Sequence, residues 1–220
     1  MLAKSTFAFL TDLKKHNDRD WFQANKERYL AAKADFEALV GEVIRAISAF
    51  DKSVEHADPA KCTFRIFRDT RFAKDKSPYK TNMGAHIGAA EKKFQQKAGY
   101  YLHLEPGNCF LGGGAYRPEG AWLKAIREAI AEDGKFFRGI INAPAFKKQF
   151  GSMSGEALKK APQGYPADHP HIELLKHKDF LAMKTLKDAD LLKPAFVKEA
   201  AAAFKALLPF NRFLNDVLEP

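Results

Sequence analysis

The stretch GYYLHLEPGNCFLGGG, residues 99–114, carries the strongest fold signal in this chain of 220 residues. It contains two strand-like runs joined at Glu-Pro-Gly-Asn, residues 105–108, and a Pro-Gly pair followed by Asn is typical of a hairpin turn. The two strands of a hairpin pair in opposite directions. The stretch therefore predicts an antiparallel sheet in the middle of the chain.

Alternation of apolar and other side chains extends this strand region. In KCTFRIF (61–67) and MGAHIG (83–88) every second side chain is apolar, which is typical of half-buried strands. We expect core strands over residues 62–115 and one further strand at FLAMKTL (180–186). The alternation also predicts a shared polar face of the sheet, formed by Arg65, His86, Tyr101, His103 and Glu105.

Helical periodicity flanks the strands on both sides. Residues 1–56 are predicted to be a helical segment, with a short helix near 6–13 and a long amphipathic helix that follows N-cap candidates in NDRD (17–20). Residues 116–220 hold further helices, the strand at 180–186 and a turn-rich loop, APQGYPADHP (161–170). This order is not a βαβ alternation. It predicts a single α+β domain over residues 1–220, with a mostly antiparallel sheet and helices packed on one face.

Composition favours an ordinary globular protein with anionic partners. The chain is 46% hydrophobic and 29% charged, and no apolar run approaches the roughly 20 residues that a membrane-spanning helix needs. No secretion signal is visible and both cysteines, Cys62 and Cys109, lie in strand-like runs, so we expect a cytoplasmic protein with free thiols and no membrane partner. The net charge of +9 favours anionic partners, although a solvated basic surface is the commoner explanation of such an excess.

The sequence RIFRDTRFAKDKSPYKTN, residues 65–82 and named the basic loop below, concentrates this charge. It carries three arginines and three lysines against two aspartates. Pro78 and the Asp75 and Ser77 side chains are expected to make its turn rigid. Guanidinium groups bind phosphate and carboxylate through paired hydrogen bonds, and lysines add point charges, so the loop is a candidate anion site. The alternative is a structural network in which Asp69 and Asp75 each pair with an arginine.

Two roles are expected within the basic loop. Arg65 and Arg68, next to the strand, are predicted to be partly buried and paired, whereas Lys74 and Lys76, at the tip, are predicted to be exposed. The predicted ligand-binding residues are Arg65, Arg68, Asp69, Arg71, Lys76, Tyr79, Lys80, His103, Tyr165 and His169.

The last two of these residues belong to a second cluster, PQGYPADHPHIELLKHK (162–178). Glycine and prolines shape this loop, and Tyr165 and His169 can reach a neighbouring cleft as hydrogen-bond donors or as a general base. The alternative is structural: Asp168 and Pro170 start a helix, and His169 satisfies a backbone group.

Metal and cofactor sites are not predicted. His169 and His171 form a His-x-His pair, and His103 with Glu105 lies across from His86, but no ligand set has a recognised spacing. The glycines at 112–114 match neither phosphate-loop template, and no nucleophile motif is present. No catalytic residue can be assigned from the sequence.

The chain resembles a known bacterial family. The resemblance rests on the basic loop together with NDRDWFQANKERY (17–29), GYYLHLEPG (99–107), GGGAYRP (112–118) and LKKAPQGYPADHPHIELLKHKDF (158–180). These long and unusual motifs resemble the family called domain of unknown function 2461, and they cover nearly the whole chain. The resemblance implies a cytoplasmic α+β protein and carries no established activity or catalytic residues.

Three classes of function remain. Binding of an anionic small molecule that bears phosphate or carboxylate, in a cleft lined by the Arg65 to Lys80 part of the basic loop, needs the fewest assumptions. The second class is an enzyme that uses the same cleft, with His86, His103 or His169 as titratable group. The third is non-specific nucleic-acid binding, for which Phe67, Phe72 and Tyr79 are the candidates for base stacking. We predict the first class and leave the ligand, any reaction and the oligomeric state open.

Overall fold

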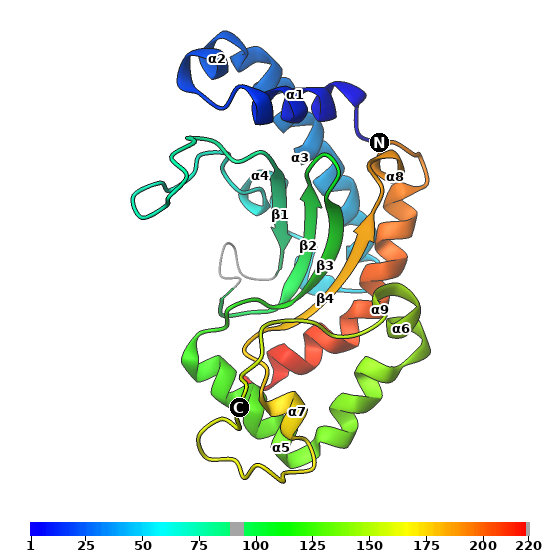
Figure 1. Cartoon of the computed structure of the whole chain (residues 1–220). Helices are drawn as coiled ribbons and strands as arrows, with labels where there is room; N and C mark the ends of the chain where they lie inside the picture. Colours follow the sequence, from blue (N-terminus) through cyan, green and yellow to red (C-terminus); the bar gives the residue numbers. More distant parts are fainter. Residues whose placement is uncertain (89–94, 219–220) are drawn as a thin grey trace. The chain divides into compact units, whose positions relative to one another are not determined.

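The predicted hairpin is present and lies at the centre of an antiparallel sheet. In the computed structural model the strands are β1 (Met83–Ile87), β2 (Gly99–Leu104), β3 (Cys109–Ala115) and β4 (Phe180–Leu186). They are hydrogen-bonded in the order β1-β2-β3-β4, as Figure 1 shows. The turn between β2 and β3 closes through the Asn108 N–H, which donates to the Glu105 carbonyl over 2.9 Å, and Gly107 has a φ of +80°, a value that favours glycine. The α+β prediction is confirmed.

The structure describes residues 1–88 and 95–218, and this part of the chain forms two compact units. The first unit comprises Met1–Ile87, Tyr101–Leu111 and Thr185–Ala201, and the second comprises the described residues within Gly88–Tyr100, Gly112–Lys184 and Ala202–Pro220. Strands β2, β3 and β4 contribute residues to both units. The single domain over 1–220, with its segments 1–56, 62–115 and 116–220, stays a prediction. Residues 89–94, within the predicted strand region, and residues 219–220 lie outside the described residues.

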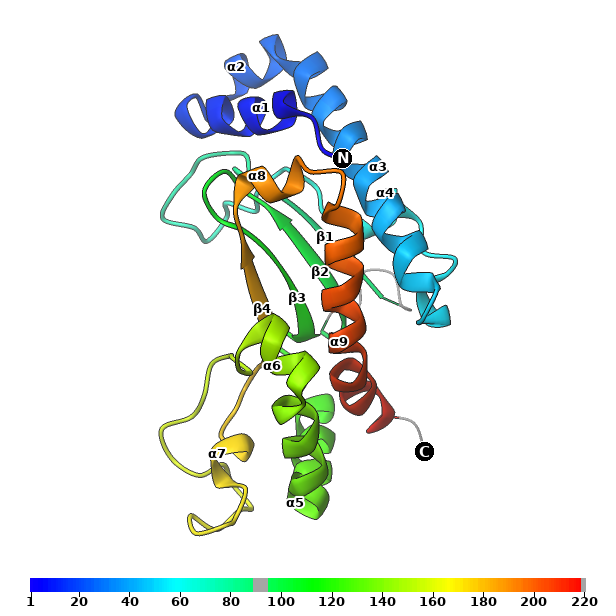
Figure 2. The same ribbon diagram turned by 90° about the vertical axis from the view of Figure 1, so that its right-hand side faces the viewer.

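The first unit contains most of the helical elements of the N-terminal part of the chain and one that follows β4. They are α1 (Lys4–Lys15), α2 (Arg19–Ala24), α3 (Lys26–Ser48), the 3-10 turn η1 (Lys52–Val54), α4 (Pro59–Cys62) and α8 (Asp188–Leu191). The long helix α3 buries one face, including Phe36, Val40 and Ile47, and packs against β1 (Figure 1). Helix α1 packs on α3 (Figure 2). The Asp18 side chain accepts the Trp21 N–H over 2.8 Å, so NDRD starts a helix, but this is the short α2; the long helix expected after NDRD begins separately at Lys26.

The second unit contains α5 (Gly120–Asn142), α6 (Pro144–Phe150), α7 (Ile172–Leu175) and most of α9 (Phe196–Asp216). Its core is aromatic. Phe204 of α9 lies edge-on against Tyr100 of β2, with 5.1 Å between ring centroids. The Trp122 indole N–H donates to the Leu214 carbonyl over 2.7 Å and joins α5 to α9.

The predicted strand at residues 62–67 is wrong. Asp58 caps a short helix by accepting the Ala60 N–H over 2.9 Å, and Pro59 starts that helix, so Cys62 is helical. The residues that follow pair with the chain near β1 only through isolated bridges, Thr63 with Ala85 and Phe67 with Tyr79. The alternation of apolar residues therefore marks an irregular extended segment at the edge of the sheet.

Two further expectations concern the thiols and the membrane. Cys62 and Cys109 are both thiols, as predicted. Within residues 1–88 and 95–218, none of the helices combines the length and the apolar character that a bilayer-spanning helix requires.

Candidate functional site

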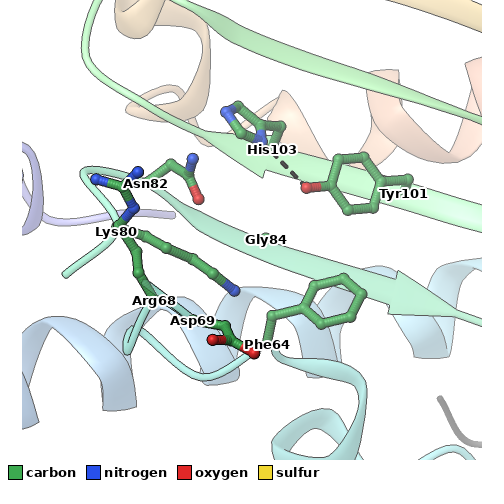
Figure 3. A pocket seen from close by; sticks show the side chains of 8 residues that line it. All are labelled: Phe64, Arg68, Asp69, Lys80, Asn82, Gly84, Tyr101 and His103. Carbon is green, nitrogen blue, oxygen red and sulfur yellow. Dashed lines mark hydrogen bonds between the residues drawn. The ribbon is translucent and has the colours of Figure 1, made fainter. Parts of the chain in front are cut away.

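A polar pocket in the first unit lies where the basic loop meets β1 and β2. Its volume is about 470 Å³. Figure 3 shows the side chains that line it: Phe64, Arg68, Asp69, Lys80, Asn82, Gly84, Tyr101 and His103. The pocket therefore combines cations of the loop with polar groups of the sheet.

The basic loop folds as an irregular hairpin. The Arg68 N–H donates to the Pro78 carbonyl over 2.9 Å, and the Lys80 N–H donates to the Ile66 carbonyl over 2.7 Å. These bonds align the two arms of the loop and bring Lys80 to the same end as Arg68. The tip of the loop, residues 70–77, lies beyond them.

Residues of the α1–α2 connection hold the returning arm. The Asn17 side-chain amide donates to the Tyr79 carbonyl over 2.9 Å, and its oxygen accepts the Tyr79 N–H at 3.1 Å. The Tyr79 ring is 4% exposed and stacks on Phe22 with 3.9 Å between centroids. Asn17 thus acts as a clamp that fixes the backbone next to Lys80, and Tyr79, predicted as a ligand-binding residue, is packed into the core.

The two aspartates of the basic loop each pair with an arginine. Asp69 binds Arg71 in a fork, with Nε–Oδ1 at 3.0 Å and Nη2–Oδ2 at 2.7 Å, and these hydrogen bonds lower the pKa of Asp69 to about 2. Asp75 accepts hydrogen bonds from Ser77 and Arg68, which hold its pKa far below the ordinary value. The structural alternative is therefore correct for two of the three arginines.

The predicted division of the loop is only partly confirmed. Arg68 is half-buried and paired, and Lys74 and Lys76 are exposed, as expected. Arg65 is exposed, so the prediction that it is partly buried is wrong. Its neighbour Ile66 is the side chain that turns into the core, at 3% exposure, and adjacent residues of an extended segment point in opposite directions.

Lys80 is a half-buried cation of the pocket that forms no salt bridge within the described residues. Burial lowers its pKa, and the positive charge of Arg65 lowers it further. Its Nζ lies 5.6 Å from the centre of the Phe64 ring, toward which the side chain extends in Figure 3. Among the residues that the structure describes, no carboxylate forms an ion pair with Lys80.

The sheet side of the pocket holds a chain of three hydrogen-bonding side chains, named the Tyr101 chain: Tyr101, His103 and Glu105. The Tyr101 hydroxyl lies 3.1 Å from His103 Nδ1, and His103 Nε2 lies 3.4 Å from Glu105 Oε2. The ring of Phe110 stacks on His103 at 4.5 Å and fixes its plane. These residues follow one another at two-residue steps, so their common side confirms the expectation of a polar face for them.

The charges of this chain follow from its surroundings. The His103 side chain is 10% exposed, and burial lowers its pKa despite the opposing effect of Glu105. Burial alone would raise the pKa of Glu105, but hydrogen bonds from Asn108, at 2.8 Å, and from His103 hold it below its ordinary value. At neutral pH the Tyr101 chain therefore contains a neutral His103 imidazole next to an ionised Glu105 carboxylate.

Gly84 makes room for the Tyr101 hydroxyl. A Cβ atom at this position would lie 2.5 Å from that hydroxyl oxygen and 3.2 Å from the ring carbon that carries it. Both distances are shorter than van der Waals contact, so any other residue at position 84 would displace Tyr101. His86, two residues further along β1, is half-buried and does not line the pocket.

The structure brings four of the predicted ligand-binding residues together in the pocket: Arg68, Asp69, Lys80 and His103. Arg71 pairs with Asp69, and Lys76 donates to the Thr70 carbonyl over 3.0 Å at the loop tip. Tyr165 and His169 belong to the second unit, where His169 Nδ1 accepts the His171 N–H over 3.1 Å. That bond matches one part of the structural alternative for residues 162–178, in which His169 satisfies a backbone group. The other part is wrong, because α7 begins at Ile172 after His171 and no side chain caps it.

Four pocket residues were not among those predicted: Phe64, Asn82, Gly84 and Tyr101. Side chains alternate between the two faces of a strand, which puts Tyr101 on the same face as His103. This alternation is the feature of the sequence that points to Tyr101. Within residues 1–88 and 95–218, no group of three or more His, Cys, Asp or Glu side chains is arranged to hold a metal ion.

Fold and pocket together define an α+β protein with a cationic pocket beside the edge strand of an antiparallel sheet. The chain belongs to the family described as Conserved hypothetical protein (DUF2461), whose profile matches residues 5–213. The resemblance carried by the basic loop and its neighbouring motifs is thereby confirmed. Neither the curated proteins nor the solved structures contain a significant match to the chain.

Proposed function

We propose that this protein binds a small ligand bearing a phosphate or carboxylate group in the pocket beside the basic loop. The observation that carries the proposal is Lys80, a half-buried ammonium group that no carboxylate of the described chain balances. A partly buried charge without a counter-ion is unfavourable, so an anion bound next to Lys80 would stabilise the folded protein.

Two further groups support an anionic ligand. Arg68 uses Nη1 for its bonds to Asp75 and Ser77, so within the described structure its Nη2 and Nε keep their donors for a ligand. The Asn82 side chain adds an amide, a neutral donor that suits phosphate and carboxylate oxygens. The volume of about 470 Å³ suits a small metabolite.

The test is a thermal melt in the presence of phosphate or sulfate, with sodium chloride at matched ionic strength as the control for screening. A ligand that binds only the folded state stabilises it by about 2.7 kcal/mol at a concentration one hundred times its Kd. We expect Lys80→Gln to abolish this shift and Lys74→Gln, an exposed cation of the same loop, to leave it unchanged. Without added anion, Lys80→Gln should be at least as stable as the parent protein, because an unbalanced charge is removed.

Arg68→Lys sharpens the test. It keeps the charge but loses the fork geometry that distinguishes phosphate from chloride. We expect this variant to lose much of the phosphate effect. Absence of any anion-dependent shift in the parent protein would contradict the proposal.

A second candidate is non-specific nucleic-acid binding, and the loop tip favours it. The Phe72 side chain is 95% exposed, and the Arg71 guanidinium lies 6.0 Å from its ring centre. Exposed aromatic rings flanked by cations stack on unpaired bases. This candidate would be supported by binding of single-stranded DNA that weakens steeply as salt is added. Phe72→Ser should then weaken the binding more than Lys80→Gln does.

We also propose that the protein is cytoplasmic, in keeping with its two thiols.

A further inference from the structure

We propose that the pocket selects anions that also carry a hydroxyl group, and that the oxygen of Tyr101 accepts the hydrogen bond from that hydroxyl. The ligand class is thus a hydroxylated phosphate or hydroxylated carboxylate. This inference rests on the proposed function, since the anionic group is held by Lys80 and Arg68, and it adds the role of the sheet side of the pocket.

The direction of the hydrogen bonds in the Tyr101 chain carries the inference. An ionised carboxylate only accepts hydrogen bonds, so Glu105 requires the proton of His103 to be on Nε2, which lies 3.4 Å away. A neutral imidazole has one N–H, and Nδ1 is then an acceptor. The hydroxyl of Tyr101, 3.1 Å from Nδ1, must therefore be the donor in that bond.

The consequence for the pocket is a hydrogen-bond acceptor on one side. Once the Tyr101 proton points at His103, the phenol oxygen offers only its lone pairs to a ligand. Phosphate and carboxylate oxygens are acceptors too, and they would face this oxygen without a proton between them. A ligand hydroxyl supplies that proton, while the charged part of the same ligand remains next to the loop cations.

Neighbouring residues keep the hydrogen bonds of the Tyr101 chain in this direction, from Tyr101 to His103 to Glu105. Glu105 also accepts from Asn108 Nδ2 at 2.8 Å and from Thr81 Oγ1 at 3.3 Å, so both of its oxygens are engaged as acceptors. Phe110 stacks on the His103 ring, and the missing side chain at Gly84 lets the Tyr101 oxygen lie in the pocket. The lowered pKa values of His103 and Glu105 agree with a neutral imidazole beside a carboxylate.

The experiment compares two phosphates by calorimetry: sn-glycerol 3-phosphate, which carries hydroxyls, and n-propyl phosphate, which does not. We expect the parent protein to bind the hydroxylated ligand about tenfold more tightly, the size of one well-formed hydrogen bond. Tyr101→Phe should reduce this ratio to about one and leave the affinity for n-propyl phosphate unchanged. The matched control is Tyr116→Phe, the same change at an exposed tyrosine, which should keep the parent ratio.

Glu105→Gln tests the direction itself. An amide donates, so it permits the proton of His103 to move to Nδ1 and frees the Tyr101 proton for the pocket. The preference for the hydroxylated ligand should then disappear, and n-propyl phosphate should bind at least as tightly as to the parent protein. A purely structural role for Glu105 predicts instead that both affinities fall together.

Nitrogen NMR of the parent protein needs no variant, and it should show the proton of His103 on Nε2. A proton on Nδ1 would overturn the inference. Equal binding of the two phosphates by the parent protein would also overturn it, and the anion site would stand. If neither phosphate, nor any other anion, stabilises the protein, the proposed function itself fails.

Discussion

The two ends of the basic loop carry similar charge in very different surroundings. At the tip, Arg71 is neutralised by Asp69, and Phe72 is 95% exposed. At the base, Tyr79 is buried against Phe22, and Lys80 is half-buried with no carboxylate partner in the described chain. The comparison shows that the number of charges in a stretch does not locate a binding site. What matters is which charges are partly buried and left unbalanced.

The largest expected contrast is in stability. Tyr79→Ala removes a buried aromatic ring stacked at 3.9 Å on Phe22, and we expect it to lower the free energy of unfolding by about 3–5 kcal/mol. Phe72→Ala removes an exposed ring of similar size and should change stability by less than about 0.5 kcal/mol. Urea denaturation measures both values. Similar losses at the two positions would mean that the tip packs against the protein in solution.

Stability is expected to depend on pH through His86, which lies in β1, the strand that follows the basic loop. Burial lowers the pKa of His86 from 6.5 to about 4. Between these values the unfolded chain binds a proton that the folded chain does not, so stability falls as pH falls from 6.5 toward 4. The slope is about 1.4 kcal/mol per pH unit, or roughly 3 kcal/mol in total.

His86→Gln isolates this contribution. Burial also lowers the pKa of His103 and of His177, so their effects have the same sign and remain in the variant. We expect denaturant melts at several pH values to show a shallower acid loss in the variant than in the parent protein. Parallel curves would mean that His86 titrates alike in the folded and unfolded states.

A smaller effect is expected at Gly84. The added methyl group of Gly84→Ala would meet the Tyr101 hydroxyl at 2.5 Å, and crowding of this kind costs about 1–3 kcal/mol. The matched control is Gly120→Ala, because no atom lies within 4 Å of the Cβ position at Gly120. Gly107→Ala is unsuitable as a control, because the positive φ of Gly107 would strain an alanine. Loss of ligand selectivity in Gly84→Ala, with an unchanged Gly120→Ala, would connect the room at this position to Tyr101.

The smallest effects separate the loop cations. Arg68→Ala breaks the pairing with Asp75 and Ser77 at a half-buried position, and a loss of about 1 kcal/mol is expected. Lys74→Ala and Lys76→Ala should leave the melting temperature unchanged, since both side chains are exposed. Equal and negligible effects at all three positions would indicate a loop that is solvated throughout.

Local patterns in the sequence were sufficient to predict the hairpin and the long helix α3. The Pro-Gly-Asn turn and a regular spacing of apolar residues are both short-range signals. The strand expected at 62–67 failed because a helix start at Asp58 and Pro59 competes with the alternation that follows. Both signals are present in the sequence, and only the packing of α4 against β1 decides between them.

The pocket was predictable only in part, for a different reason. The charges of the basic loop pointed to the correct region, and the period of two placed Tyr101 beside His103. The bond of Asn17 to the Tyr79 backbone joins residues 62 positions apart, which no local pattern reveals. The direction of the Tyr101 chain depends on the position of one proton, which follows from the distances to Glu105 and Tyr101.

The Asn17 clamp also connects ligand binding to the N-terminal helices. Because one side chain bonds both the N–H and the carbonyl of Tyr79, local opening of the α1–α2 connection releases the backbone next to Lys80. A ligand held by Lys80 would oppose that opening. Occupancy of the pocket should therefore be visible at a distance, as slower amide hydrogen exchange and slower proteolysis in α1 and α2, segments that do not line the pocket.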